Sequence, residues 1–285
     1  MIKVIKYFIQ SLIIFLLFFI GRIVGITLSR KIFSSLFLLI GPFFKSKITI
    51  EKNLNIFSKN ISPVERKNIS KNMWKNYGMT FIEYIFLDTF RKKNTHIETE
   101  GEINLINPIK NNQPVVFISG HFSNFELMSM EITKKNINLA TIYRPLNNFF
   151  LNPLMEFLRK KYVCKNQIKK GINGVREAIQ YIKNNYSIAL MIDQRVSEGE
   201  LINFFDKPAL TTTLPAQLAM KYDLAIIPVS IKRIENNKFK IQFLDEIKAK
   251  NFKDKLELTK ELNKVLEKMI IKNPGQWIWT HNRWK

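Results

Sequence analysis

Apolar residues follow two different patterns along the chain. Between residues 2 and 44 they are nearly continuous, in the runs Tyr7–Ile20 and Ile32–Phe44, with only scattered polar and basic residues. After residue 44, short apolar runs alternate with longer segments in which apolar residues recur every three or four positions, the spacing of an amphipathic helix. The pattern predicts a hydrophobic segment, residues 1–44, followed by one domain of alternating strands and helices, residues 45–285.

Five short apolar runs have the β-branched and aromatic composition of buried strands. They lie at residues 115–118, 139–143, 187–192, 225–232 and 238–244. Helical segments separate the first four runs, which favours parallel pairing through helical crossovers. The polar residues between the last two runs predict an antiparallel hairpin. The expected fold class is therefore α/β, a single domain with a central, mostly parallel sheet flanked by helices.

Two helix boundaries carry clear signals. Ser62 and Pro63 combine a capping residue with a proline at the first helical position. An amphipathic segment that begins at Leu256 is ended by Asn273-Pro274-Gly275, because proline and glycine do not continue a helix. We expect helices to start and stop at these positions.

The first 44 residues are expected to attach the protein to a membrane. A span across a bilayer needs about 20 predominantly apolar residues. The first run is shorter than this unless Arg22 is accommodated, and the second run is shorter still. No small-residue cleavage site follows the apolar core, which argues against a cleaved signal peptide. Three arrangements stay open: a single marginal span, a hydrophobic hairpin in one leaflet, and a pair of interfacial helices.

The chain has 285 residues and a formal net charge of +22. This charge indicates an anionic partner, such as a membrane surface or an acidic protein, although many lysines simply solvate the surface. The apolar N-terminus and the lack of a recognisable nucleic-acid-binding motif argue against nucleic acid as the partner. A single cysteine, Cys164, and three widely separated histidines predict neither a disulfide nor a metal site.

The candidate chemistry lies in the turn that follows the first predicted strand. Gly120 permits a sharp turn there, and Ser123 or Asn124 can cap the helix that follows. This places His121 in the strand-to-helix corner and Glu126 in the first helical turn. Open α/β sheets bind their ligands at such corners, beyond the carboxyl ends of the strands.

His121 and Glu126 can act together as a general base. A neutral imidazole accepts a proton from a hydroxyl near neutral pH. A carboxylate hydrogen bonded to the other ring nitrogen fixes the tautomer and stabilises the imidazolium that forms. The chain has no Gly-x-Ser-x-Gly motif and no evident serine or cysteine nucleophile, so the expected nucleophile is a hydroxyl of the substrate. The alternative is a structural histidine hydrogen bonded to a nearby glutamate.

The sequence Gly-His-Phe-Ser-Asn-Phe-Glu at residues 120–126 resembles the His-x4-acid motif of the glycerolipid acyltransferase superfamily. More closely, it resembles the late acyltransferases of lipid A biosynthesis, the lauroyl and myristoyl transferases. Three further stretches agree, in the same order: Ile142–Pro145, Ile192–Arg195 and Trp277–Lys285. The resemblance implies an O-acyltransferase at the bacterial inner (cytoplasmic) membrane, with its catalytic domain on the cytoplasmic face and no cofactor.

The resemblance also implies the substrates and several site residues. The donor would be an acyl-acyl-carrier-protein and the acceptor a phosphorylated glycolipid, a precursor of lipid A. Arg144 is expected to bind an anionic group of the acceptor, and Asp193 and Gln194 to bind substrate or organise the site. Independently of the resemblance, Asn124 is expected to assist in stabilising the oxyanion. Arg159 lies in the basic cluster Arg159-Lys160-Lys161, for which the two alternatives are contact with substrate by Arg159 and a solvated helix face.

Other functions stay open at this point. Lysophospholipid acyltransferases, and glycolipid acyltransferases that use acyl-CoA, share the same His and acid pair, but we do not expect the tryptophan-rich ending in them. A non-catalytic basic protein that binds anionic lipid is the alternative from another class. Replacement of His121 by alanine separates the two classes, because only an enzyme would lose acyl transfer while keeping its binding to lipid.

Overall fold

Within the residues described by this computed structural model, 2–44, 47–58, 60–110 and 113–285, eight strands form a central sheet. Its order is β1-β9-β8-β2-β5-β3-β4, and β10 also pairs with β8. The strands are β1 (Ile97–Glu100), β2 (Val116–Ser119), β3 (Leu139–Tyr143), β4 (Asn166–Lys169), β5 (Ser187–Met191), β8 (Ala225–Arg233), β9 (Phe239–Phe243) and β10 (Ile247–Lys248). Pairing is parallel except where β8 meets β9 and β10. The predicted fold class, including the terminal hairpin, is confirmed.

Side chains of the central strands alternate between two hydrophobic cores. Val116 of β2 lies in one core, with helices α9 (Leu214–Tyr222) and α10 (Lys255–Lys272). Phe117 lies in the other core, with α6 (Glu126–Lys134). Because helices cover both faces, β2 is buried along its whole length, which accounts for its continuous apolar sequence.

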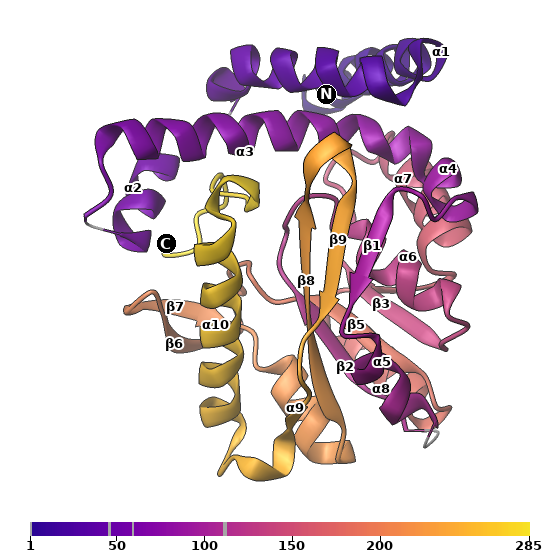
Figure 1. Ribbon diagram of the computed structural model, residues 1–285, viewed down its shortest axis with the longest axis vertical. Helices are drawn as coiled ribbons and strands as arrows, with labels where there is room; N and C mark the ends of the chain where they lie inside the picture. The colour runs from indigo at the N-terminus through magenta and orange to yellow at the C-terminus, as the bar shows by residue number, and fades with distance from the viewer. Residues whose placement is uncertain (1, 45–46, 59, 111–112) are drawn as a thin grey trace.

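Further helices and a small hairpin surround this centre (Figure 1). They are α2 (Lys47–Phe57), α3 (Pro63–Glu83), α4 (Leu87–Lys92), α5 (Glu102–Lys110), α7 (Asn152–Leu158), α8 (Ile172–Lys183), and the paired strands β6 (Glu200–Phe204) and β7 (Lys207–Thr211). Both predicted helix boundaries are confirmed: Ser62 caps α3, with Pro63 at its first position, and α10 ends at Lys272.

Helix α3 crosses the molecule at the carboxyl end of β8 and beside the turn after β2 (Figure 1). Thr80 of α3 donates a hydrogen bond to the backbone oxygen of Ser123, 2.9 Å away. Glu83, the last residue of α3, forms an ion pair with Arg233 at the end of β8. The end of the sheet at which the sequence predicts a site is therefore framed by α3.

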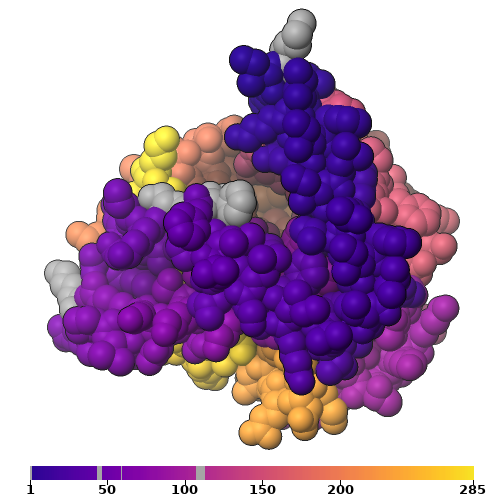
Figure 2. Space-filling model, turned by 90° about the horizontal axis from the view of Figure 1, so that it is seen from above, coloured from indigo at the N-terminus to yellow at the C-terminus, as the bar shows by residue number. Residues whose placement is uncertain are grey.

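The N-terminal segment is one long helix, α1 (Ile2–Phe44), interrupted at Gly25, whose φ is 79°. It lies along α3 on the outside of the molecule (Figures 1 and 2). Gly78 of α3 permits this close approach, since a Cβ there would lie 2.2 Å from the backbone oxygen of Phe33. The two apolar runs of the sequence thus form one bent helix packed against the domain.

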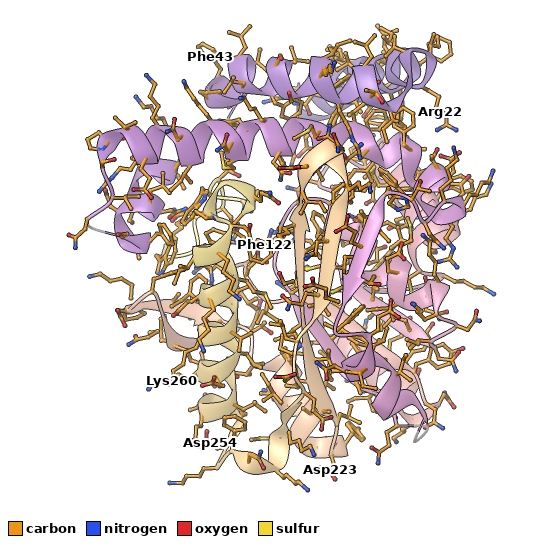
Figure 3. The ribbon with its side chains drawn as sticks, in the orientation of Figure 1. Arg22, Phe43, Phe122, Asp223, Asp254 and Lys260 are labelled. Atoms are coloured by element: carbon orange, nitrogen blue, oxygen red, sulfur yellow. The ribbon has the colours of Figure 1, made fainter. Side chains whose placement is uncertain are left out.

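Most large apolar side chains of α1 are exposed, and Figure 3 shows one of them, Phe43, on the side of the helix that faces away from the domain. Among the described residues it is the one helix that is long and apolar enough to cross a membrane, and only 17% of its most apolar stretch is buried. A core helix of this length would be mostly covered by protein. The predicted boundary between anchor and domain falls beside residues 45–46, which lie outside the described residues, so the division into 1–44 and 45–285 stays a prediction.

Candidate active site

The turn after β2 is held from two sides. Its Ser123 has a φ of +47°, a left-handed conformation that residues other than glycine seldom adopt. The backbone N–H of Ser123 donates to the oxygen of Gln276, 3.1 Å away, and Phe122 forms an isolated bridge with Trp277. With Thr80 on the other side, α3 and the C-terminal segment together fix the conformation of the turn.

His121 and Asp193 meet because of the register of two parallel strands. Ser119 of β2 pairs with Met191 of β5, and each site residue follows its strand at the same distance. Nδ1 of His121 lies 2.7 Å from Oδ1 of Asp193, and the backbone N–H of His121 donates to Oδ2 at 2.8 Å. Nε1–H of Trp277 donates to the same Oδ2 at 2.9 Å. Two hydrogen bonds from His121 and one from Trp277 therefore fix the Asp193 carboxylate, which in turn orients the imidazole.

This environment raises the pKa of His121. Burial alone would lower it, but the charge and hydrogen bond of Asp193 outweigh burial, and Glu126 adds a smaller contribution in the same direction. The same pair holds the pKa of Asp193 below its usual range, although burial on its own would raise it. The ring remains reachable, because 19% of the His121 side chain is exposed.

The partner predicted for the ring nitrogen is corrected by the structure. Asp193, not Glu126, is hydrogen bonded to Nδ1 of His121. Oε1 of Glu126, at the first position of α6, instead accepts hydrogen bonds from the Tyr84 hydroxyl and from Nε of Arg159, both at 2.7 Å. Strand register brings Asp193 to the ring, while Arg159 and Tyr84 engage Glu126. Arg159 is thus joined to the site through Glu126.

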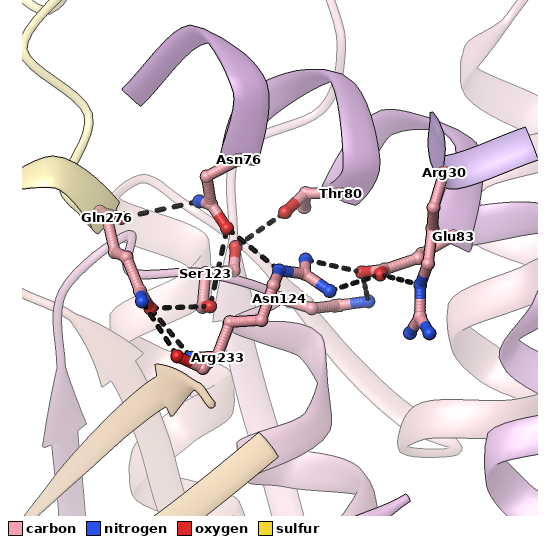
Figure 4. A network of polar contacts seen from close by, with 8 residues as sticks. All are labelled: Arg30, Asn76, Thr80, Glu83, Ser123, Asn124, Arg233 and Gln276. Carbon is pink, nitrogen blue, oxygen red and sulfur yellow. Dashed lines mark hydrogen bonds and ion pairs between the residues drawn. The ribbon is translucent and has the colours of Figure 1, made fainter. Parts of the chain in front are cut away.

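The predicted helix cap is also corrected. The residue before α6 is Phe125, and no side chain caps this helix. Asn124 donates through Nδ2 to Glu83, 3.0 Å away, and the hydroxyl of Ser123 donates to Oε1 of Gln276 at 3.0 Å. Tertiary partners have drawn both predicted capping side chains away from α6 (Figure 4).

The remaining predicted site residues follow neighbouring strands. Gln194 comes directly after Asp193 and is half-buried, whereas Arg144 follows β3 and is exposed. Because β5 lies between β2 and β3, His121, Gln194 and Arg144 belong to the same edge of the sheet. Neither Gln194 nor Arg144 has a side-chain hydrogen bond or ion pair to another described residue, so both are available to a ligand.

Sequence reasoning missed several residues that support the site. Glu83 and Tyr84 lie in a helical segment whose aromatic residues recur at helical spacing, a pattern that by itself favours a role in the core. Trp277 belongs to the tryptophan-rich ending, whose sequence gives it no distinct role, and its side chain is buried at 1% exposure. A glutamate inside an otherwise apolar helical stripe was the one available signal, because a buried charge requires a partner.

The described residues contain no group of three or more histidine, cysteine or acidic side chains that could hold a metal ion. The other two histidines have structural surroundings. His281 accepts a hydrogen bond at Nε2 from the backbone N–H of Arg195, 2.9 Å away. His96 packs on Phe90, and burial lowers its pKa to about 4.

A cavity of about 920 Å³ lies between α2 and the β6–β7 hairpin, with Phe57, Phe205 and Trp284 among its lining residues. Its volume lies within the range of ligand pockets. A row of packed aromatic rings lies between the cavity and the site. Trp277 packs on Trp279 at 4.6 Å, and Trp279 packs on Phe57 at 5.1 Å, both measured between ring centroids. The cavity is thus separated from His121 by packed tryptophans.

Comparisons with known proteins give a consistent result. A family model described as bacterial lipid A biosynthesis acyltransferase matches residues 1–285. The lipid A biosynthesis palmitoleoyltransferase of Escherichia coli strain K12 is 24% identical over 254 residues, which cover 86% of this chain and 80% of that protein. A lipid A biosynthesis acyltransferase of Haemophilus influenzae is 21% identical over 247 residues, which cover 82% and 76%.

Among solved structures, the 1-acyl-sn-glycerophosphate acyltransferase PlsC of Thermotoga maritima is similar to this chain. The alignment covers 95% of this chain and 99% of that chain, with 17% sequence identity and a TM-score of 0.44. The family match, for its part, includes every site residue described above.

Proposed function

The chain belongs to the bacterial lipid A biosynthesis acyltransferases, and on this basis we propose how it catalyses acyl transfer. It is an acyltransferase that acts on lipid A. The proposed reaction transfers a fatty acyl chain from an acyl-acyl-carrier-protein to a hydroxyl of a phosphorylated lipid A precursor. His121 is the proposed general base.

The contact between His121 and Asp193 is the observation that carries this proposal. With Nδ1–H donating to the Asp193 carboxylate at 2.7 Å, Nε2 is left unprotonated and can accept a proton. Nε2 removes the proton of the acceptor hydroxyl as its oxygen attacks the thioester carbonyl carbon. The tetrahedral intermediate then collapses, the C–S bond breaks, and the imidazolium returns the proton to the departing thiolate.

Glu126 and Arg159 form the second charged pair of the proposed site. The negative charge of Glu126 favours the protonated form of His121, so it would stabilise the imidazolium that develops during attack. Its hydrogen bond to Nε of Arg159 would fix the guanidinium for contact with substrate, since a planar guanidinium in a fixed position binds anionic groups with defined geometry.

The oxyanion of the tetrahedral intermediate requires hydrogen-bond donors. Helix α6 begins at Glu126, five residues after His121, and the preceding residue Phe125 provides no side-chain cap. The first backbone N–H groups of a helix lack intrahelical partners and favour negative charge. The N–H groups of Leu127 and Met128 already donate to the backbone oxygens of Asn124 and Phe125, so we assign oxyanion stabilisation to the N–H of Glu126, with Asn124 nearby in the turn.

The positive charge of the protein favours the binding of two anionic substrates. Arg144, exposed at the end of β3, is the proposed contact for a phosphate of the acceptor. The net charge of +22 would attract both an acidic carrier protein and a lipid phosphate, because long-range attraction raises the rate of encounter.

The exposed apolar face of α1 supports membrane attachment. Its packing along α3 is consistent with a helix that stays against the domain, which favours an interfacial position over a free-standing span. We place the catalytic domain at the cytoplasmic face of the inner membrane, where acyl-carrier-protein is available as donor.

Acyl transfer by detergent-solubilised protein tests the proposal. Acyl-carrier-protein and CoA thioesters are offered separately as donors, and a lipid A precursor or a lysophospholipid as acceptor. We expect transfer from the carrier protein to the lipid A precursor, and its loss in His121→Ala. Transfer only from acyl-CoA, or only to the lysophospholipid, would overturn the proposed substrates, and full activity of His121→Ala would overturn the proposed base.

A further inference from the structure

The carboxylate of Glu83, at the end of α3, is fully buried and accepts four hydrogen bonds (Figure 4). Nε of Arg30 and Nη1 of Arg233 each lie 2.6 Å from Oε1. Nη2 of Arg233 and Nδ2 of Asn124 lie 3.1 Å and 3.0 Å from Oε2. A single side chain thus joins three separate parts of the molecule to α3.

The partners of Glu83 come from different parts of the structure. Arg30 belongs to α1, the proposed membrane helix. Arg233 ends β8, and Asn124 lies in the turn that carries His121, three residues after it. Glu83 therefore connects the helix that meets the membrane to the turn that holds the proposed base.

The charges in this cluster do not balance, because two guanidinium groups surround one carboxylate. Nη2 of Arg30 and Oδ1 of Asn124 are also buried without a hydrogen-bond partner among the described residues. Burying charged groups costs free energy, and well-packed apolar residues of similar volume are often at least as stabilising. An unbalanced cluster beside the site is therefore poorly explained by stability alone.

The turn itself needs support of this kind. Ser123 keeps its left-handed backbone conformation, φ +47°, only while the surrounding contacts hold it. Thr80 and Gln276 bind its backbone, and the amide of Asn124 next to it is bound by Glu83. Displacement of Asn124 would therefore change the backbone conformation of the turn that contains His121.

We propose that Arg30 and Glu83 are positioning residues. Through them, the packing of α1 against the domain determines the conformation of the catalytic turn, residues 120–125. The proposal rests on the proposed function of His121 in acyl transfer. Arg30 orients the Glu83 carboxylate from the membrane side, Glu83 holds Asn124, and Asn124 fixes the turn. A small displacement of a catalytic group lowers the rate strongly without contact between the altered residue and the substrate.

The chain contains a matched control on the same helix. Arg22 of α1 also binds the body of the protein, through hydrogen bonds of 3.0 Å and 2.6 Å to the two oxygens of Asp88. Asp88 lies on α4 and has no hydrogen bond to the catalytic turn. Arg22→Met thus removes another ion pair between α1 and the domain, a more exposed one with 48% of the Arg22 side chain accessible, and it leaves the contacts of Glu83 in place.

The test compares Arg30→Met, Arg30→Lys and Arg22→Met in full-length protein. The measurements are kcat and KM for acyl transfer, partition into anionic liposomes, and amide hydrogen exchange in peptides covering residues 119–127. We expect Arg30→Met to lower kcat about ten- to a hundredfold with little change in KM or partition, and to accelerate exchange in the turn. Arg30→Lys should recover part of the loss, and Arg22→Met should change neither kcat nor exchange in the turn.

Equal effects of Arg30→Met and Arg22→Met on kcat and on exchange would overturn the proposal, because the role of Arg30 would then be general packing of α1. Hydrogen exchange keeps the test independent of the assigned reaction. If the wild-type protein fails to acylate a lipid A precursor, the proposed function fails, while altered exchange at residues 119–127 in Arg30→Met still supports the link from α1 to the turn. Unaltered exchange there contradicts that link.

Discussion

Nδ1 of His121 lies 2.7 Å from Oδ1 of Asp193, although 72 positions separate the two residues in the sequence. They follow two adjacent parallel strands whose register is fixed by the pair Ser119 and Met191. The imidazole is thus oriented by a residue from a different strand rather than by the glutamate five positions along its own turn.

Replacement of Asp193 by asparagine should reduce acyl transfer far more than it reduces folding. Asparagine keeps the size of the side chain, but it neither stabilises the imidazolium nor fixes the Nδ1–H tautomer. We expect kcat/KM to fall about 10²- to 10⁴-fold, measured with a lipid A precursor and matched by circular dichroism of the folded variant. Activity within a factor of three of wild type would contradict the role of this pair.

The pH dependence of kcat/KM should show one ascending limb set by His121. Only the unprotonated ring accepts a proton, so activity is low below the pKa and rises through it. Because Asp193 raises this pKa above its usual value of 6.5, the limb should lie above pH 6.5. Glu126→Gln removes a charge that favours imidazolium, so its limb should move to lower pH. A limb that moves upward would show that Glu126 acts differently.

The variant Trp277→Phe should show whether Trp277 acts through its hydrogen bond to Asp193 or only through the packing of its ring. This change removes the Nε1–H that donates to Oδ2 of Asp193, and we expect a roughly tenfold loss of kcat. The control is Trp279→Phe, since Nε1–H of Trp279 donates to the backbone oxygen of Pro274. Both rings are buried, so both variants should lose stability. A comparable loss of kcat in Trp279→Phe would mean that packing, not the hydrogen bond, matters.

Glu83→Gln should destabilise the fold strongly, because Arg30 and Arg233 would be left buried without a counter-charge. Loss of one partner of a buried ion pair typically costs about 3–5 kcal/mol, which thermal or denaturant unfolding in detergent would measure. The double variant Glu83→Gln with Arg30→Met removes one surplus charge and should recover part of that loss. No recovery in the double variant would indicate that charge imbalance is not the cause.

Arg144→Ala should weaken binding of the acceptor with little effect on the chemical step. Arg144 is exposed at the end of β3, and loss of one charge-assisted contact to a phosphate is expected to raise KM about tenfold. Arg176→Ala, an exposed arginine on α8, serves as control for the change in net charge. Equal effects of the two variants would point to long-range attraction instead of a specific contact.

Local sequence signals predicted the buried centre of the fold well. The runs that became β2, β3 and β5 are apolar because helices cover both faces of the sheet. The runs of β8 and β9 were also predicted, and β9 alternates buried apolar with partly exposed polar residues because only one of its faces lies in a core. The edge strand β4 was not predicted, because only Ile168 among its residues is buried and its sequence has no strand pattern. The hairpin β6–β7 was not predicted either. Phe205 and Asp206 at its turn both have positive φ, 50° and 55°, without the Asn-Gly sequence that announces such turns.

The candidate site could be predicted only in part. Glycine, histidine and the strand before them located the turn, but the partner of the imidazole depends on which strands are neighbours, and no local pattern encodes that. Glu126 was assigned to His121 because the two are close in sequence. Arg159 and Tyr84 bind Glu126 in the structure. They could not be predicted, because basic residues most often face solvent and aromatic residues most often fill the core.

The position of Gln276 and Trp277 in the chain has a consequence for how the protein is made. These residues support the turn that holds His121 and also support Asp193, yet a ribosome adds them after that turn, after Asp193 and after every strand of the central sheet. Helix α1 precedes the domain in the sequence, so it leaves the ribosome before the domain does and can reach the proposed membrane while most of the domain is still unmade. The enzyme would therefore be delivered to its membrane before it can react, and an unfinished chain would be bound there without activity.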